Sequence, residues 1–283
     1  MRNNQIRVSA SIVLYNTPEA MLFRLLACIK NSSVVDIVYL IDNSPAPLQY
    51  NFFDQPTINY KWSGVNAGYG GGHNIALKKV IEQASDFHFV LNPDIYFEPQ
   101  ELQKMIVRMN DDPSIGQLMP KVIYPDGSLQ YLCKLIPRPI DLFLRRFLQG
   151  PFKELAKRKA EEFELRFTGY NDEMDVPYLS GCFMLFRISA IKKIGLFDER
   201  FFMYPEDIDI TRRMHAQFRT LFFPSATIVH DHAKDSYKSK KMLWIHLTNL
   251  IKYFNKWGWF FDMERKKINA HTLELLRKNH NAD

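Results

Sequence analysis

The chain has 283 residues, of which 46% are hydrophobic, and this is enough for one large domain or for a domain with appendages. Its three cysteines are scattered without a CxxC pair, which excludes a disulfide framework and a zinc knuckle and favours a reduced, cytoplasmic setting. No run reaches the roughly 18 apolar residues of a membrane-spanning helix, so we do not expect an integral membrane protein.

The net charge of +6 is unevenly placed. Seven basic and two acidic residues fall within Arg138–Lys159, and nine basic and three acidic residues fall within Lys234–Lys267. The remainder of the chain is therefore slightly acidic. A nucleic-acid-binding protein is more often basic over its whole reading face, so no nucleic-acid partner is expected.

The first third of the chain alternates between short apolar runs and helical patterns. Apolar residues at helical spacing from Met21 to Ile29 predict a helix, with Thr17 as its cap and Pro18 at its first position. A second helix is expected from Ile75 to about Ala84. Strands are predicted at Val8–Tyr15, Val34–Ile41, Ile58–Trp62 and Phe87–Leu91. This alternation indicates an α/β fold built from βαβ units.

The remainder of the chain continues with mixed elements. Helices are expected from Pro99 to about Asn110, over Arg138–Lys159, over Ser189–Ile194 and through the C-terminal fifth. Strands are expected at Ile115–Tyr124, Val176–Leu179, Cys182–Arg187, Thr220–Phe223 and Ala226–Val229.

The segment Asn92-Pro-Asp94 follows directly after the apolar run Phe87–Leu91. Proline ends the strand, so Asp94 is expected just past its carboxyl end, where ligands bind in open α/β sheets. A carboxylate there, with the Asn92 amide nearby, can hold a hard divalent cation that also takes phosphate oxygens. The alternative is a plain turn, since all three residue types are common turn formers.

Five glycines fall within Gly64–Gly72. The segment lacks the GK[ST] of a phosphate-binding P-loop, and Gly68-x-Gly70-x-x-His73 lacks the third glycine of the dinucleotide motif. A flexible loop that runs into a helix N-terminus can still seat a phosphate or sugar hydroxyls. We favour ligand contact over an ordinary turn because one turn does not need five glycines.

Glu206, Asp207 and Asp209 follow Pro205 at the expected start of a helix. Acids in a first helical turn often only offset the helix dipole. Adjacent Glu and Asp side chains point in different directions, however, so that one can cap the helix while the other faces a cleft as a general base. Both interpretations stay open on these residues alone.

His230 and His232 lie two apart at the end of a predicted strand and would point to opposite faces, so that one could reach a metal or a diphosphate. A purely structural histidine is the alternative. Asp42 ends another buried strand at the same expected sheet edge as Asp94, where it could bind a nucleotide base or ribose or could cap a helix.

Taken together, these residues resemble the family-2 inverting glycosyltransferases of the GT-A fold, from about Val8 to His232. The segments that carry the resemblance are SIVLYN (Ser11–Asn16), IDNSP (Ile41–Pro45), NAGYGGGHN (Asn66–Asn74), LNPD (Leu91–Asp94), SGCFMLFR (Ser180–Arg187) and FFMYPEDIDITRR (Phe201–Arg213). Their combination is specific, whereas any one of them is not.

The resemblance implies roles for individual residues. The DxD metal motif of the family falls on Asn92-Pro-Asp94 with Asn92 in place of the first aspartate, so Asp94 would hold Mg²⁺ or Mn²⁺ with help from a histidine, His230. The catalytic pair of the family falls on Glu206 and Asp207, with Asp207 as the base. The other implied contacts are Tyr15, Asn16, Asp42, Asn66, Gly68, Asn74 and Asn92 for the nucleotide sugar, and Ser180, Gly181 and Tyr204 for the acceptor.

The resemblance also implies an activity. The QxxRW motif of processive relatives is absent, which indicates transfer of a single sugar. The LNPD, SGCFMLFR and FFMYPEDID segments look most like rhamnosyltransferases of bacterial surface polysaccharide assembly, with dTDP-rhamnose as donor and a glycan or lipid-linked glycan as acceptor. The alternatives are a galactofuranosyl- or hexosyltransferase on the same fold, and a non-catalytic scaffold that binds nucleotide sugars.

We therefore expect residues 1–232 to form a GT-A domain with a mixed, mostly parallel central sheet, and residues 233–283 to form a basic helical extension packed on it. Both basic stretches interleave charge with apolar residues, as amphipathic helices at an anionic membrane surface do. This pattern predicts a cytoplasmic protein that docks peripherally on the inner face of the cell membrane. The alternative is that the apolar stripes pack on the catalytic domain.

Overall fold

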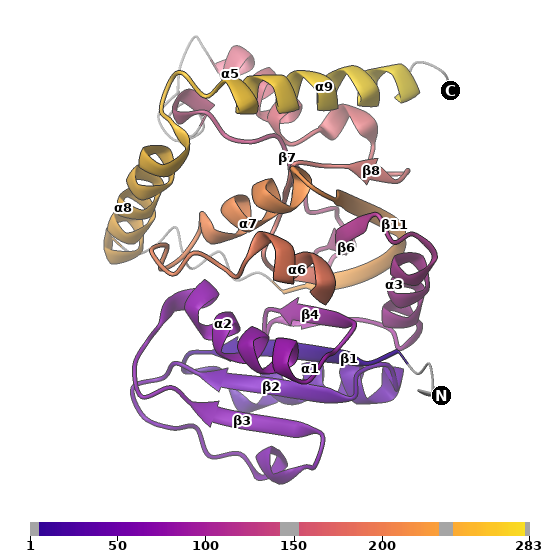
Figure 1. Ribbon diagram of the computed structural model, residues 1–283, viewed down its shortest axis with the longest axis vertical. Coiled ribbons are helices and arrows are strands. Elements are labelled where there is room, and N and C mark those ends of the chain that lie inside the picture. Colours follow the sequence, from indigo (N-terminus) through magenta and orange to yellow (C-terminus); the bar gives the residue numbers. More distant parts are fainter. Residues whose placement is uncertain (1–5, 142–152, 232–239, 281–283) are drawn as a thin grey trace.

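The computed structural model describes residues 6–141, 153–231 and 240–280. Their largest element is a nine-stranded sheet in the order β3-β2-β1-β4-β10-β6-β11-β5, with β8 beside β11 (Figure 1). The strands are β1 (Val8–Leu14), β2 (Ile37–Asp42), β3 (Ile58–Trp62), β4 (Phe87–Leu91), β5 (Ile95–Tyr96), β6 (Ile115–Ile123), β8 (Met174–Asp175), β10 (Phe183–Arg187) and β11 (Arg219–His230). A separate pair joins β7 (Cys133–Lys134) to β9 (Tyr178–Leu179).

Strand β10 runs against its neighbours in the middle of this sheet, and β5 and β8 run against β11 at its edge. Strands β3, β2, β1 and β4 are mutually parallel. Strand β10 is antiparallel to β4 and to β6, while β6 and β11 are parallel to one another. The expected α/β fold with a mixed, mostly parallel sheet is therefore confirmed.

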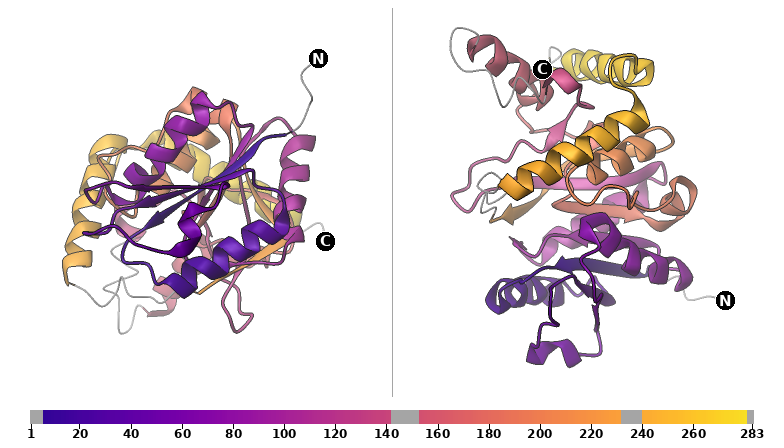
Figure 2. Two further views of the ribbon diagram at one scale, coloured as in Figure 1. Left: turned by 90° about the horizontal axis from the view of Figure 1, so that it is seen from below. Right: turned by 90° about the vertical axis from the view of Figure 1, so that its left-hand side faces the viewer.

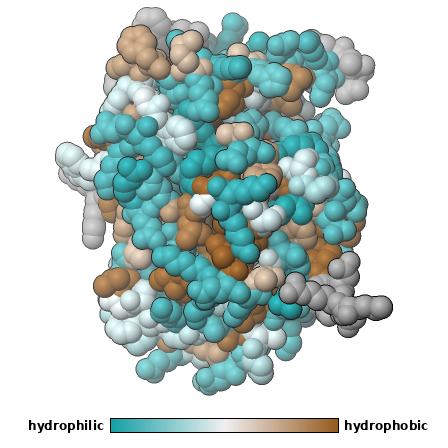
Figure 3. Space-filling view, viewed as in Figure 1, coloured by the Kyte–Doolittle hydropathy of each residue, from teal (hydrophilic) through white to brown (hydrophobic). Residues whose placement is uncertain are grey.

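Helices cover both faces of the sheet (Figure 2). Leucine and isoleucine side chains of α1 (Glu19–Ser32) and α3 (Gln100–Asp111) pack on one face, and those of α2 (Gly68–Glu82), α6 (Ile188–Ile194) and α7 (Glu206–His215) pack on the other. The outer surface seen in Figure 3 is mostly hydrophilic, with hydrophobic residues gathered near its centre. The sheet is thus buried on both sides, which explains why its strands read as continuous apolar runs.

The glycine-rich segment is helical rather than a loop, which corrects the expectation that its helix begins at Ile75. Helix α2 begins at Gly68, whose φ of +75° and close approach to Phe202 exclude a side chain: an added Cβ would lie 2.2 Å from the Phe202 carbonyl oxygen. One turn later, a Cβ on Gly72 would lie 2.6 Å from Val13 Cγ2. These glycines let the helix pack closely against β1 and the 202 loop, and helix propensity is outweighed by that packing.

Two smaller expectations also change. Thr17 does not cap α1, because its Oγ1 accepts a hydrogen bond from the Tyr15 N–H and Pro18 occupies the cap position without a side-chain bond. The strands expected at Thr220–Phe223 and Ala226–Val229 are one strand, β11, whose register shifts between Phe223 and Thr227. Pro224 lies at this shift, where its missing N–H is tolerated.

The C-terminal part is helical, as expected. Helix α8 (Lys240–Trp257) packs Leu250, Tyr253 and Phe254 against Phe201 and Ile208, and α9 (Met263–His280) follows it. None of the described helices is long and apolar enough to cross a membrane. Of the helix expected over Arg138–Lys159, residues 142–152 lie outside the described part, and α5 (Lys153–Phe163) follows them.

The buried Arg212 of α7 ties the two C-terminal helices to the sheet domain. Its guanidinium forms two hydrogen bonds with Asp262, at 2.7 and 2.8 Å, and a third with Glu264 at 2.9 Å. The Arg212 guanidinium also stacks 4.0 Å from the centre of the Trp257 ring. A buried ion pair satisfied in this way fixes α7 relative to the corner between α8 and α9.

Candidate active site

Several predicted site residues meet at one edge of the sheet. Strands β1, β2 and β4 are parallel, so Tyr15, Asp42 and Asp94 are found at or just beyond neighbouring carboxyl ends. Strand β10 starts at this same edge because it runs antiparallel to β4, and the Asn92 N–H donates a hydrogen bond to the Cys182 carbonyl at 3.0 Å. The segment Ser180–Cys182, here called the 180–182 turn, therefore links the loop after β4 to the acids of α7.

Asp94 and His230 form one of two side-chain pairs at this edge. Asp94 Oδ1 lies 3.3 Å from His230 Nε2, and the Asp94 carbonyl accepts a hydrogen bond from the Asp231 N–H at 2.9 Å. Within the described residues Asp94 Oδ1 is buried and has no hydrogen-bond partner. A buried carboxylate oxygen beside an imidazole nitrogen fits a divalent cation. His232 lies outside the described residues.

Gln130 orients the His230 ring, and no sequence signal pointed to it. Its Nε2 donates to the His230 carbonyl at 2.7 Å, so its Oε1 faces the ring and accepts from Nδ1 at 3.0 Å. Nδ1 therefore carries a proton, and Nε2, the nitrogen that could bind a metal, faces Asp94. Burial lowers the pKa of His230, but Cys182 and Asp94 outweigh burial and raise it to about 10. Cation binding at Nε2 would therefore release a proton.

Glu206 and Asp207 form the second pair, at the start of α7. Both are buried, yet their environments differ. Asp207 Oδ2 accepts hydrogen bonds from the Gly181 N–H at 2.9 Å and from the Tyr178 hydroxyl at 3.4 Å, and Oδ1 accepts from the Ile208 N–H at 2.8 Å. Among the described residues, Glu206 Oε2 is buried without a partner.

These contacts separate the two carboxyl groups. Burial raises the pKa of both, and the negative charge of Asp207 raises that of Glu206 further. The N–H donors on Asp207 and the nearby Lys134 ammonium favour its charged form, so Asp207 ionises before Glu206. One neutral acid beside one carboxylate with a raised pKa is an arrangement suited to a general base.

Asp209, the third acid of this turn, has a structural role. Its Oδ2 lies 2.9 Å from the Arg213 Nε, and its Oδ1 accepts from the Trp257 indole at 2.8 Å and lies 2.6 Å from the Lys256 Nζ. The carboxylate is fully buried among these partners. Asp207, by contrast, is hydrogen-bonded to the 180–182 turn.

The residues predicted for the nucleotide differ in accessibility. Tyr15 is exposed, and the Asn16 N–H donates to Ser44 Oγ at 2.8 Å, which joins the ends of β1 and β2. Asp42 has no exposed surface, and its carboxylate accepts hydrogen bonds from the Ser44 and Leu48 N–H groups and the Tyr60 hydroxyl. Asp42 therefore organises the loop after β2, and a nucleotide contact would require that loop to open.

The residues predicted from the glycine-rich segment also serve the packing of α2. Asn66 Oδ1 accepts from the Gly68 N–H at 3.0 Å, before the first turn of the helix. Asn74 is buried, and its amide is hydrogen-bonded to the backbone of Phe197 and to Glu199. Asn74 thereby holds the 197–199 loop against α2.

The residues predicted for the acceptor differ in their relation to Asp207. Gly181 touches it directly, Ser180 is partly exposed, and Tyr204 has a φ of +91° with its ring 4.6 Å from that of His246 on α8. A non-glycine residue with positive φ beside the start of α7 stores backbone strain of the kind found at functional sites. Tyr178 and Lys134, on β9 and β7, border the same carboxylate and were not anticipated.

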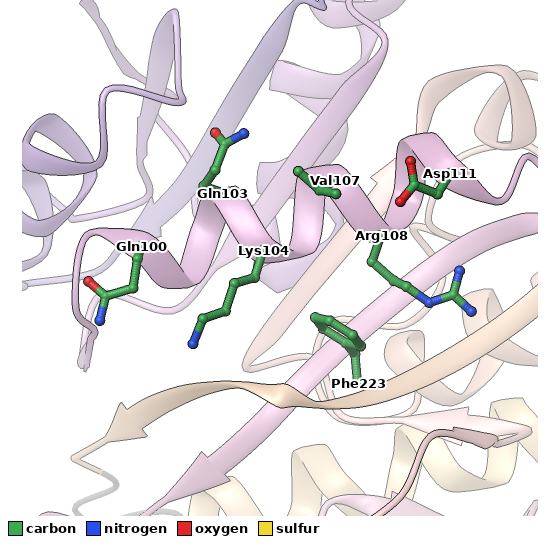
Figure 4. Close-up of a pocket in the computed structure, with 7 residues that line it drawn as sticks. All are labelled: Gln100, Gln103, Lys104, Val107, Arg108, Asp111 and Phe223. Carbon is green, nitrogen blue, oxygen red and sulfur yellow. The ribbon is translucent and has the colours of Figure 1, made fainter.

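A surface hollow of about 430 Å³ lies elsewhere, between α3 and Phe223 of β11 (Figure 4). Its side chains belong mainly to α3, among them Gln100, Lys104 and Arg108. None of the predicted site residues lines it. Within the described part of the chain, no group of three or more His, Cys, Asp or Glu side chains could hold a metal ion. Asp94 and His230 therefore provide two ligands at most from that set.

Comparison with known proteins gives relatives in sequence and in fold. No family model matches the chain. It is 30% identical over 187 residues to N-acetylglucosaminyl-diphospho-decaprenol L-rhamnosyltransferase of Mycobacterium tuberculosis, over 63% of this chain and 60% of that protein. It is 29% identical over 199 residues to rhamnosyltransferase WbbL of Escherichia coli K12, over 68% of this chain and 71% of that protein. The matched region thus spans less than two thirds of the mycobacterial relative.

The fold matches that of a solved glycosyltransferase. The mannosyltransferase PcManGT of Pyrobaculum calidifontis, in complex with GDP-Man and Mn²⁺, aligns with a TM-score of 0.54 at 15% identity, over 90% of this chain and 64% of that one. At this identity the match concerns the fold alone. The chain therefore has a GT-A fold, and its resemblance to the rhamnosyltransferase-like members of glycosyltransferase family 2 is confirmed.

Proposed function

We propose that the protein is an inverting glycosyltransferase that moves one sugar from a nucleotide diphosphate donor to a hydroxyl of a glycan acceptor. The observation that carries this proposal is the Asp207 carboxylate, which is buried, held by the Gly181 N–H and joined through the 180–182 turn to the Asp94–His230 pair. A base and a pair of side chains that fits a divalent cation, at one sheet edge, suit the acceptor side and the donor side of a glycosyl transfer.

Asp207 would take the proton of the acceptor hydroxyl as the oxygen attacks the anomeric carbon. Its raised pKa makes it a stronger base than an exposed aspartate, and its N–H donors keep it ionised ahead of Glu206. Glu206 stays protonated and leaves Asp207 as the single negative charge of the pair. A single displacement needs one base and inverts the anomeric centre.

Mg²⁺ or Mn²⁺ fits Asp94 Oδ1 and His230 Nε2, with the donor diphosphate as the source of further oxygen ligands. The buried Asp94 oxygen without a hydrogen-bond partner among the described residues supports this assignment. When bound, such a cation neutralises charge on the departing nucleoside diphosphate. Gln130 keeps the His230 ring turned toward Asp94 throughout.

The donor is dTDP-rhamnose in this proposal, because the mycobacterial and E. coli relatives described above are named rhamnosyltransferases. The mycobacterial relative is named for a diphospho-decaprenol substrate, so a lipid-linked glycan is the proposed acceptor, in bacterial surface polysaccharide assembly. A donor panel tests this assignment. Thermal shift with dTDP-rhamnose, UDP-galactofuranose and UDP-hexoses, with and without Mn²⁺, should show the largest stabilisation with dTDP-rhamnose and Mn²⁺, about 2.7 kcal/mol at 100 times the dissociation constant.

A second measurement separates an enzyme from a scaffold. A transferase should release dTDP slowly from dTDP-rhamnose without acceptor in the presence of Mn²⁺, whereas a scaffold that only binds should release none. Binding of another sugar nucleotide with no response to dTDP-rhamnose would contradict the donor assignment alone.

We also propose that residues 1–232 form the catalytic domain, that residues 233–283 dock on it, and that the protein binds the inner face of the cell membrane. Phe260 and Phe261, between α8 and α9, are 70% and 90% exposed, and Lys266 and Lys267 follow them. Arg265 reaches the Pro137 carbonyl, so the start of the first basic stretch adjoins the second. Exposed aromatic residues flanked by lysines suit an anionic lipid surface.

Vesicle sedimentation tests the membrane proposal. Binding to vesicles with anionic lipid should exceed binding to neutral ones, should weaken with salt and should be lost on charge reversal at Arg145, Arg146, Lys240 and Lys241. The first two residues lie outside the described part of the chain. Equal recovery with both vesicle types, or none with either, would contradict membrane docking and leave the transferase proposal standing.

A further inference from the structure

Tyr69, in the first turn of α2, contacts the 180–182 turn from the side opposite Asp207. Its hydroxyl donates a hydrogen bond to the Gly181 carbonyl oxygen, while the Gly181 N–H donates to Asp207 Oδ2 at 2.9 Å. The carbonyl and the N–H belong to successive peptide groups that meet at the Gly181 Cα. A bond that fixes one of these peptide groups therefore restrains the other.

The residue at this junction has to be small, and this makes it dependent on outside support. An added Cβ on Gly181 would lie 3.2 Å from Asp207 Cβ and 3.5 Å from Tyr69 Cε1. Glycine fits between the two side chains but has the widest backbone freedom of any residue. The position of its N–H is consequently set by the hydrogen bonds at either end of the turn.

Tyr69 is itself held rigidly. Its backbone N–H donates to the Phe202 carbonyl at 3.0 Å, and its ring packs edge-on against that of His73, with the centroids 4.5 Å apart. His73 in turn is fixed by a hydrogen bond of 2.7 Å between its Nδ1 and Ser11 Oγ in β1. The hydroxyl thus transmits the position of α2 and β1 to the 180–182 turn.

We propose that Tyr69 is a positioning residue for the base, and that its hydroxyl holds the 180–182 turn so that the Gly181 N–H stays on Asp207. The proposal rests on the proposed function only in naming Asp207 as the base. The other titratable groups that face Asp207 are Glu206 on α7, Tyr178 on β9 and Lys134 on β7. Tyr69 acts on it through the backbone and makes no contact with the reacting atoms.

The consequence for Asp207 has a definite sign. An N–H donor stabilises the carboxylate over the carboxylic acid, so a loosened turn raises the pKa of Asp207. A base with a higher pKa is protonated over more of the neutral range. Loss of the Tyr69 hydroxyl therefore moves the acid limb of the rate profile to higher pH and lowers turnover at pH 7.

Tyr69→Phe tests this with Tyr170→Phe as the matched control. The Tyr170 hydroxyl also donates hydrogen bonds to backbone carbonyls, those of Cys133 and Glu164. Tyr170 belongs, however, to a separate hydrophobic cluster around Met119 and Phe222. We expect Tyr69→Phe to shift the acid limb of kcat upward by about one pH unit, so that kcat falls by about twofold at pH 7 and by about tenfold at pH 5, with the donor KM unchanged. Tyr170→Phe should leave the profile in place.

The ionisation of Asp207 can be followed without turnover, by carboxyl ¹³C NMR of aspartate-labelled protein, with Asp207→Asn to assign the signal. The midpoint should rise in Tyr69→Phe and stay unchanged in Tyr170→Phe. Gly181→Ala approaches the same link from the other side and should raise the midpoint with Tyr69 intact. Unchanged midpoints in Tyr69→Phe would overturn the positioning role. If the wild type transfers no sugar, the proposed function fails, while the NMR midpoints still decide the role of Tyr69.

Discussion

Asp42, at the end of β2, and the Glu206–Asp207 pair, at the start of α7, are all buried, but their pKa values are shifted in opposite directions. The Asp42 carboxylate accepts hydrogen bonds from two N–H groups and a hydroxyl, and these lower its pKa despite its burial. The pKa values of Glu206 and Asp207 are raised, and within the described residues Glu206 Oε2 has no hydrogen-bond partner. The hydrogen bonds on Asp42 outweigh its burial and keep it a weak base that supports the fold, whereas burial outweighs the hydrogen bonds on Asp207 and leaves it a stronger base.

The substitution of Asp94 should have the largest effect on activity, because it removes a proposed ligand of the divalent cation. We expect Asp94→Ala to abolish transfer and the Mn²⁺ dependence of nucleotide binding while leaving the fold intact, because Asp94 lies beyond the end of β4 and outside the hydrophobic core. Calorimetric titration of dTDP with and without Mn²⁺ measures this. Full activity in the variant would assign the Asn92–Asp94 segment to a plain turn.

The α7 pair should respond asymmetrically. Asp207→Asn keeps the shape of the side chain but cannot accept a proton, so kcat should fall by about 10² to 10⁴ with donor affinity unchanged. Glu206→Gln should be the milder change, because Glu206 is already neutral. Steady-state kinetics on both variants decides the roles, and a crippled Glu206→Gln beside a mild Asp207→Asn would exchange them.

Substitutions in the two regions should change the free energy of unfolding in opposite directions. Asp42→Asn places an amide N–H₂ among N–H donors and should lower the free energy of unfolding by about 1–3 kcal/mol. Burial disfavours the charged form of Glu206, and Glu206→Gln removes this ionisable group. The substitution should therefore leave the free energy of unfolding unchanged or raise it by about 1 kcal/mol at neutral pH. Urea unfolding at pH 7 measures both, and equal losses would erase the distinction between the two regions.

A smaller, pH-dependent effect should come from two buried histidines beneath the site. His88 forms hydrogen bonds with Ser9 and Ser11, and Ser11 forms another with His73. Burial lowers the pKa of both imidazole rings, that of His88 to about 3. Below about pH 6.5 the unfolded chain binds protons that the folded chain does not, so the free energy of unfolding falls with decreasing pH by about 1.4 kcal/mol per unit for each ring. His88→Gln should reduce the slope of the free energy of unfolding against pH by about 1.4 kcal/mol per unit between pH 6.5 and 4, as measured by urea unfolding. An unchanged slope would contradict the burial of His88 as a neutral ring.

Sequence patterns predicted the first four main strands well because each is a short apolar run between turn residues. They also singled out Asp94, His230, Glu206 and Asp207 as candidates, because these residues stand at predicted element ends; their roles stay predictions. Gln130 gave no signal, because its role depends on the approach of a loop after β6 to the end of β11. The start of α2 was not predicted, because its glycines are required by close contacts with β1 and Phe202, and a local sequence pattern does not contain these contacts.

The stereochemistry of the product tests the central claim most directly. Wild-type protein, Mn²⁺, dTDP-rhamnose and a polyprenyl-diphosphate-linked N-acetylglucosamine acceptor should yield one dTDP for each glycosidic bond, and NMR of the product should show the anomeric configuration opposite to that of the donor. Asp207→Asn should form the same product, slowed by about 10² to 10⁴. A product that retains the donor configuration, or an Asp207→Asn variant as fast as the wild type, would contradict a single displacement driven by Asp207.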